Sequence, residues 1–419
     1  MTTEQLTEDP QSRDVDVRGS GLLAAGILVM NVATFGFQIL AARILGPENY
    51  SGINSMLSLL LVVAVLQLGL QATAARRVAE APGDVRAIER TMKAVTNRAA
   101  ITITVLMLAL SPLVEYGLKL PNIWPALLVA VCAYPITIWG GQAGILQGER
   151  RWRELALLYL ANGVPRLVLG PIFMLVHPTE TSAMLAVTIA QFAPTIVGYW
   201  VLREKHVHEA HPDMKGAVAE SLHGSFALLG FFALANIDAI AISKHTLDAR
   251  NAGLYAAGLI VAKVVLFLPQ SVIVLVFPSM SKSESQRRAL VMSLSVIGVL
   301  GVVSVLGSWI LSGLALVFVG GNDYQGVQHD LWRFAVLGTA LSVLQLLVYS
   351  VLARQHRASS ILIWLAFGAV VLFGLQQSSL DGLVTTVSII DATLMIVLLT
   401  HSLWATRRGP QPELDPTAT

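Results

Sequence analysis

The sequence predicts an all-α membrane protein, with twelve transmembrane helices in two parallel six-helix lobes and with cytoplasmic N- and C-termini. Three observations predict this fold class: the length and number of the apolar stretches, the placement of Lys and Arg between them, and a match between the two halves of the chain. The composition agrees, because 55% of the residues are hydrophobic and 13% are charged. That charged share is about half that of a soluble domain. Such a chain works in transport or in chemistry at a membrane.

The apolar stretches are long enough to cross a bilayer as helices. A hydrocarbon core about 30 Å thick needs roughly 20 residues of helix, and a helix satisfies its own backbone polar groups in lipid. The polar, acidic segment before the first stretch lacks the basic n-region of a signal peptide, so we expect the first stretch to be retained. The predicted helices span residues 20–42, 52–74, 99–118, 124–146, 155–176, 182–202, 219–244, 253–280, 289–318, 330–353, 359–376 and 383–405.

The basic residues predict the orientation of these helices. Of 28 Lys and Arg residues, 21 lie in the termini and in alternate gaps, five lie in the other gaps, and two lie inside helices. Cytoplasmic loops carry the excess of Lys and Arg, so both termini are predicted to be cytoplasmic. The largest cytoplasmic gap, about residues 75–98, is predicted to form a charged surface helix. All outward loops are short, which argues against membrane glycosyltransferases and polysaccharide polymerases.

The two halves of the chain match at an offset of 201 residues. The segment from Arg43 to Gly52 aligns with the segment from Lys244 to Gly253, and each segment joins an odd-numbered predicted helix to the next one. Six helices per half is an even number, so the halves share one orientation, as in transporters built of parallel repeats. The predicted division is a disordered N-terminus (1–19), an N-terminal lobe (20–202), a connecting loop (203–218), a C-terminal lobe (219–405) and a tail (406–419).

Two cations lie in the middle of predicted helices, where a charge costs about 2.5–3.5 kcal/mol on insertion scales. Arg166 shares one face of the fifth helix with Tyr159 and Asn162, because their spacing is i, i+3 and i+7. Lys263 shares a face of the eighth helix with Gln270. We interpret Arg166, Asn162, Lys263 and Gln270 as substrate-binding residues that line a polar, cationic cavity between the halves and hold an anionic headgroup.

Two acids also lie within predicted helices. Asp238 and Asp391 are each interpreted as a counter-ion for the buried cations or, alternatively, as a proton or Na⁺ coupling site. As counter-ions they would pair with Arg166, which would make that arginine structural.

Arg43 and Lys244 lie at the outer ends of the first and seventh helices. They either snorkel to the interface or form a cationic ring at the outer mouth, where they would also contact substrate.

The histidines of the connecting loop, His206, His208 and His211, lie among basic residues, and we expect no metal site there. No nucleophile elbow, zinc-ligand set or phosphate-cradling glycine loop occurs. We therefore expect no catalytic residues, no cofactor and no enzymatic activity.

Two segments resemble the polysaccharide transport family of oligosaccharide flippases, in the multidrug/oligosaccharidyl-lipid/polysaccharide flippase superfamily. The first is AARILGPENY at 41–50, continued by LQLGLQ at 66–71 and ARRVAE at 75–80; it is similar to the first hairpin of that family. The second is Asn236-Ile-Asp238 followed by AGLYAA at 252–257, and GNDY at 321–324 resembles the turn after the ninth helix. The resemblance covers essentially the whole membrane region.

The resemblance implies a two-lobed transporter of a bacterial plasma membrane. Its substrate would be a polyprenyl-pyrophosphate-linked oligosaccharide, flipped for the synthesis of a cell-surface polysaccharide. Arg and Lys suit a pyrophosphate, and Arg can bind it with two hydrogen bonds. The expected partners are this substrate, the lipid bilayer and polysaccharide-assembly enzymes, with no nucleic acid. Two alternatives stay open: a cation-coupled drug or solute antiporter of the same fold, and a membrane scaffold for polysaccharide enzymes that transports nothing.

Overall fold

The computed structural model describes residues 10–81, 83–202, 216, 226, 228–276, 286–354 and 357–407. The predicted connecting loop with its three histidines, apart from Gly216, and most of the predicted C-terminal tail lie outside these residues. The predicted disordered N-terminus (1–19) lies outside them only as far as residue 9; from Pro10 onward it is helical, so the prediction of disorder is wrong there. The side chain of Gln270 also lies outside the described part, although its backbone belongs to a helix.

All regular structure in the described residues is helical. The elements are α1 (Pro10–Glu80), α2 (Val85–Ala109), α3 (Ser111–Gly117), α4 (Trp124–Gly148), α5 (Trp152–Val176), α6 (Glu180–Val201), η1 (Asp238–Ile242), α8 (Ser243–Thr246), α9 (Ala249–Val276), α10 (Gln286–Ile310), α11 (Ser312–Val319), η3 (Asn322–Asp330), α12 (Leu331–Arg354), α13 (Arg357–Gly374) and α14 (Leu380–Arg407).

The helices overlap the predicted spans but do not share their bounds; the third span, predicted at 99–118, begins at Val85 and is divided at Leu110. Among the described residues, 10 helices are long and apolar enough to cross a membrane, and Ser360–Gly374 is a shorter apolar helix. One of the 10, Gly21–Glu80, holds both of the first two predicted spans in a single 60-residue segment. The chain is therefore a multi-pass, all-α membrane protein, while the number of twelve crossings and the cytoplasmic termini stay predictions.

Gly46 breaks α1 into two helical arms and lets the chain turn back. Gly46 has φ +70° and ψ 171°, and a positive φ is adopted readily only by glycine. Pro47 follows, and proline is favoured at the first position of a new helical arm because its φ is already helical. The two arms of α1 on either side of Gly46 are thus separate helices, as the first predicted hairpin requires, and the second arm begins directly after the break.

Three predicted features are wrong in detail. The charged gap at 75–98 is not a surface helix of its own, because Ala75 to Glu80 end α1 and Val85 already begins α2. The seventh predicted helix is interrupted before η1, a short π-helix that starts at Asp238. The ninth is divided at Leu311 into α10 and α11.

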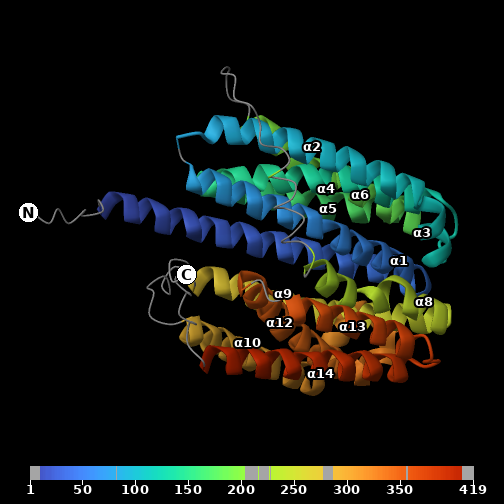
Figure 1. Ribbon diagram of the computed structural model, residues 1–419. Coiled ribbons are helices and arrows are strands. Elements are labelled where there is room, and N and C mark those ends of the chain that lie inside the picture. The colour runs from blue at the N-terminus through green and yellow to red at the C-terminus, as the bar shows by residue number, and fades with distance from the viewer. Residues whose placement is uncertain are drawn as a thin grey trace, which may run out of the picture.

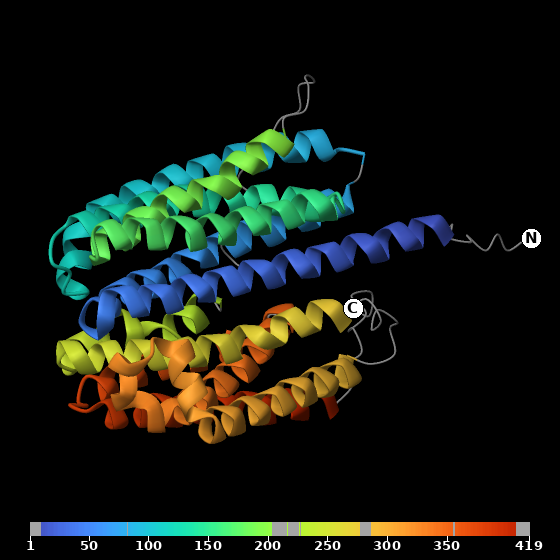
Figure 2. The ribbon, with the colours of Figure 1, turned by 180° about the vertical axis from the view of Figure 1, so that it is seen from behind.

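The helices form two groups that face one another along α1 (Figures 1 and 2). In the first group α1, α2, α4, α5 and α6 pack together, and in the second α9, α10, α12, α13 and α14 do so. Contacts between the groups are made chiefly by α1 with α9 and η1. Turns at one end of the bundle include Gly46 and the break between α8 and α9, which the repeat aligns. We call this the outer end, after the predicted orientation, and the opposite end the inner end.

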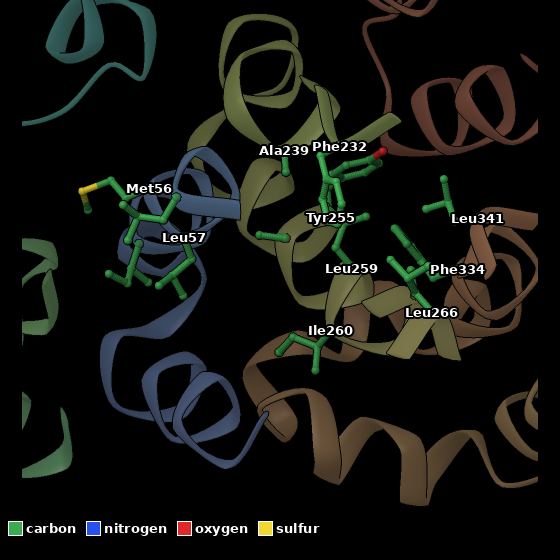
Figure 3. Close-up of a cluster of buried hydrophobic side chains, with 14 of the residues drawn as sticks. Met56, Leu57, Phe232, Ala239, Tyr255, Leu259, Ile260, Leu266, Phe334 and Leu341 are labelled. Carbon is green, nitrogen blue, oxygen red and sulfur yellow. The ribbon is translucent and has the colours of Figure 1, made fainter. Parts of the chain in front are cut away.

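Apolar packing closes the boundary between the groups. Met56 is fully buried and Leu57 nearly so. Both belong to one cluster with side chains of η1, α9 and α12, shown in Figure 3. Within it, the Ser55 Oγ donates a hydrogen bond of 2.6 Å to the Ala239 carbonyl oxygen. The second arm of α1 is thus the surface on which the second helix group rests.

Thiol labelling tests the predicted orientation. In a Cys132→Ser background, cysteines at Glu48, Thr179 and Asp323 should react with a membrane-impermeant reagent added outside intact cells, and one at Arg90 should not. All four positions are exposed in the structure, so reactivity reports the side of the membrane. The reverse pattern would invert the predicted topology.

Candidate functional site

A polar face of α5 points into the first helix group. Gly163 lets α5 approach α1 closely, because a Cβ at this position would lie 2.8 Å from the Met30 backbone. The Asn162 Nδ2 consequently lies 3.4 Å from the Met30 Sδ. Tyr159, Asn162 and Arg166 do share one helical face, as the spacing predicts; Tyr159 and Asn162 contact α1, and Asn162 and Arg166 contact α6.

Arg166 is held by a neutral partner. Its Nη2 donates a hydrogen bond of 2.7 Å to the Gln191 Oε1, and the Gln191 Nε2 donates one of 3.0 Å to the Asn162 Oδ1. The buried Arg166 Nε has no hydrogen-bond partner in the described part of the chain. No ion pair of Arg166 with Asp391 or Asp238 occurs among the described residues, so the counter-ion that the sequence suggests is replaced by an amide.

Lys263 lies on the boundary between the two helix groups. Its Nζ donates to the Ser58 Oγ at 2.8 Å and to the Asn54 Oδ1 at 3.5 Å. Both acceptors belong to the second arm of α1, whereas Lys263 belongs to α9, so these bonds join the groups. Only 6% of Lys263 is exposed. In the second group it interacts electrostatically with Asp238.

The two acids lie together in the second helix group. The Tyr255 hydroxyl donates a hydrogen bond of 2.6 Å to the Asp238 Oδ2. The Asp238 Oδ1 and both carboxylate oxygens of Asp391 are buried without a hydrogen-bond partner in the described residues. Asp391 is 0% exposed, and its carboxylate interacts electrostatically with Asp238. The described electrostatic partner of Asp391 is thus Asp238, and the described hydrogen-bond donor of Asp238 is the Tyr255 phenol.

Arg43 and Lys244 both lie at the outer end. The Arg43 Nη2 donates a hydrogen bond to the Val317 carbonyl oxygen, which reaches across the boundary. Lys244 interacts electrostatically with Glu180 and Lys119.

The predicted cations therefore occupy three places: the interior of the first group, the boundary, and the outer end. No described contact joins Arg166 to Lys263, and the single cavity between the halves stays a prediction.

A set of amides at the inner end escaped the sequence-based prediction. The Gln67 Nε2 donates to the Gln71 Oε1 at 2.9 Å. The Gln71 Nε2 in turn donates to the Gln147 Oε1 at 2.9 Å and to the Tyr159 hydroxyl at 3.3 Å. We call Gln67, Gln71, Gln147 and Tyr159 the glutamine–tyrosine cluster. The i, i+4 spacing of Gln67 and Gln71 in an apolar helix was the available signal.

A cavity at the inner end lies apart from the predicted site residues. A cavity of about 400 Å³ at the inner end is lined by Val78, Ala79, Val85, Gly148, Glu149 and Arg150, and by none of the predicted site residues. No group of three or more His, Cys, Asp or Glu side chains that could hold a metal occurs in the part of the chain that the structure describes.

Comparison with known proteins places this fold. The sequence profile of the family described as "Polysaccharide biosynthesis protein" matches residues 17–284. No curated protein sequence matches the chain. A structure described as the inward-facing conformation of a multidrug resistance MATE family transporter of the MOP superfamily is similar, with a TM-score of 0.71 at 15% identity; the match covers 91% of this chain and 94% of that one.

Two further solved structures are similar over most of their length. The outward-facing conformation of a multidrug resistance MATE family transporter matches with a TM-score of 0.65 at 16% identity, covering 94% of this chain and 96% of the other. A MOP superfamily transporter from Pyrococcus furiosus, described as having a binding pocket of reversed polarity, matches with a TM-score of 0.57 at 17% identity, covering 94% and 95%. The chain therefore belongs to the polysaccharide biosynthesis protein family, and its fold is that of the MATE transporters of the MOP superfamily.

Proposed function

We propose that the protein is a flippase of a bacterial plasma membrane, which moves a polyprenyl-pyrophosphate-linked oligosaccharide to the outer leaflet. The observation that carries the proposal is Arg166, a guanidinium within the first helix group whose described hydrogen bond goes to the neutral Gln191. A buried charge without an opposite charge is costly, and such residues within a membrane mark binding sites or pathways. A pyrophosphate supplies the missing negative charge and two acceptors for the guanidinium fork.

Lys263 is a second candidate contact for the same anion. Its ammonium is bonded to the hydroxyl and amide oxygens of Ser58 and Asn54 across the boundary. If the groups part at this boundary, those bonds break and the ammonium becomes available to a ligand. We propose that the pyrophosphate passes from Arg166 to Lys263 as the groups move, while the polyprenyl chain stays in the bilayer.

The described conformation is closed at the outer end. The Tyr324 hydroxyl donates a hydrogen bond of 2.8 Å to the Ala42 carbonyl oxygen, and the Cα of Gly253 packs against the Pro47 carbonyl group. Both contacts join the two helix groups. We propose that substrate release to the outer leaflet requires these contacts to break, as alternating access demands.

A cation-coupled antiporter of the same fold is the second candidate. It is favoured by one observation, the buried oxygens of Asp238 and Asp391 that lack hydrogen-bond donors in the described residues. Two buried carboxylates that repel each other favour binding of a proton or of Na⁺, which removes the repulsion. The same site also suits a flippase driven by an ion gradient.

A flux assay tests the proposal and separates the candidates. Proteoliposomes that contain the protein should move a fluorescent polyprenyl-pyrophosphate-linked oligosaccharide between leaflets, because the anion has a cationic site to occupy. A matched glycolipid joined through an uncharged ether should not move. Transport of a cationic dye against a proton gradient, without movement of either glycolipid, would instead identify the antiporter.

A further inference from the structure

The glutamine–tyrosine cluster is built from three helices and carries no charge. Gln67 and Gln71 come from the second arm of α1, Gln147 from α4 and Tyr159 from α5. The Tyr159 ring meets the Trp139 ring edge to face, with centroids 5.6 Å apart. Amides, a phenol and an indole side by side can offer both donors and acceptors, together with an aromatic surface. A sugar, with many hydroxyls and no charge, fits this chemistry better than a phosphate does.

Close helix packing fixes the position of the cluster. A Cβ at Gly140 would lie 2.5 Å from the Gln67 carbonyl oxygen, and one at Gly144 would lie 2.4 Å from the Gln71 carbonyl oxygen. Glycines spaced four residues apart let the backbones of two membrane helices approach closely. α4 is therefore held against α1, and the Gln147 amide meets the Gln71 amide at a set distance.

The cluster has unused hydrogen-bonding capacity at its inner edge. Gln147 is exposed, and its Oε1 accepts the bond from Gln71. Its Nε2 has no described hydrogen bond, so both of its protons are available. The Tyr159 hydroxyl accepts from Gln71 and keeps its own proton to donate. A ligand at the inner end thus meets donors that are already oriented by the buried part of the cluster.

Tyr159, the member of the cluster that belongs to α5, lies on the same helical face as Arg166. Tyr159 precedes Arg166 by seven residues, which is about 10 Å along a helix. Because α5 begins at the inner end, Tyr159 is the nearer of the two to the predicted cytoplasm. A lipid-linked sugar that enters from the inner leaflet has its pyrophosphate toward the bilayer and its sugar toward the water. With the pyrophosphate at Arg166, the first sugar reaches the level of Tyr159 and Gln147.

We propose that the glutamine–tyrosine cluster is the subsite for the sugar next to the pyrophosphate, with Gln147 and Tyr159 as the residues that contact its hydroxyls. The proposal rests on the flippase function proposed above, because Arg166 sets the position of the anion. The carrier anion is then recognised by Arg166, and the glycan is recognised separately at the inner end of α5.

Equilibrium binding to the purified protein in nanodiscs tests this division. The probes are undecaprenyl pyrophosphate and the same carrier linked to glucose, galactose or N-acetylglucosamine. We expect the wild type to bind at least one glycolipid more tightly than the bare carrier. Gln147→Leu and Tyr159→Phe should each reduce that preference by about tenfold, the effect of one lost hydrogen bond, and leave affinity for the bare carrier unchanged.

Two further variants make the outcome decisive. Gln376→Leu removes an exposed glutamine amide at the outer end and should leave all affinities unchanged. Arg166→Ala should weaken binding of all four probes to a similar degree. Equal affinity of the wild type for bare and glycosylated carriers, or a preference that survives both cluster variants, would overturn the sugar subsite. If none of the probes binds, or Arg166→Ala has no effect, the proposed function itself fails.

Discussion

Replacing Arg166 with alanine is expected to abolish flux of a lipid-linked oligosaccharide while the protein still inserts and folds. Loss of two charge-assisted hydrogen bonds, at about 1.5–3 kcal/mol each, predicts a fall in flux of roughly 100-fold or more. The melting temperature in detergent should stay within a few degrees of the wild type, because the substitution removes a cation whose described partner, Gln191, is neutral. Arg166→Lys should recover part of the flux, since an ammonium cannot reproduce the planar guanidinium fork.

The competing explanation is that Arg166 only supports the fold by bonding to Gln191. In that case Arg166→Ala would lower the melting temperature, because the Gln191 Oε1 would be left buried without a donor. The double variant Arg166→Ala/Gln191→Leu would then restore stability. If it also restored flux, Arg166 would not be a substrate-binding residue. Flux and melting temperature are therefore measured on both variants.

Gly253→Ala is expected to prevent closure of the outer end. A Cβ at this position would lie 1.9 Å from the Pro47 carbonyl oxygen and 2.3 Å from its carbonyl carbon. These are backbone atoms of α1 and cannot rotate aside, so the two helix groups must separate. We expect spin labels on cysteines at Thr179 and Gln376, in a Cys132→Ser background, to show a longer distance between the groups by pulsed electron paramagnetic resonance. Flux should be lost, because the cycle needs the closed state.

The internal repeat supplies a matched control for this variant. Gly52 is the position that aligns with Gly253, but a Cβ there would meet the carboxylate of Glu180, the far end of a flexible side chain in the same helix group. Gly52→Ala should therefore leave the distance between the labels unchanged. Unaltered distance and flux in Gly253→Ala would contradict the assignment of this contact as part of the outer closure.

Hydropathy predicted the helices because each span must satisfy one strong local rule, namely enough apolar residues to cross the bilayer. The separate spans 20–42 and 52–74 predicted a break in α1, and the structure places it at Gly46, whose φ of +70° is not helical. The gap at 75–98 was misread because its charges resemble a surface helix, whereas they extend two membrane helices beyond the apolar zone.

The site was less predictable, because its contacts join residues far apart in the chain. Periodicity placed Asn162 and Arg166 on one face of α5, but it could not identify Gln191 as the partner that bonds to both. Lys263 was expected to line a cavity, and its bond to Ser58 spans 205 residues of sequence. Both partners are neutral, so no rule of charge complementarity pointed to them.

Three hydrogen bonds that join the two helix groups share a further property: their acceptors are main-chain carbonyls. Tyr324 bonds to the carbonyl of Ala42, Ser55 to that of Ala239, and His245 to that of Gly117. Any amino acid at the accepting position supplies the same oxygen, so natural drift there leaves the bond intact. Selection for these hydrogen bonds consequently acts on the donor residue and not on the side chain of the acceptor residue. The two positions will therefore not coevolve. Deep mutational scanning should find intolerance at the donors and tolerance at their acceptors.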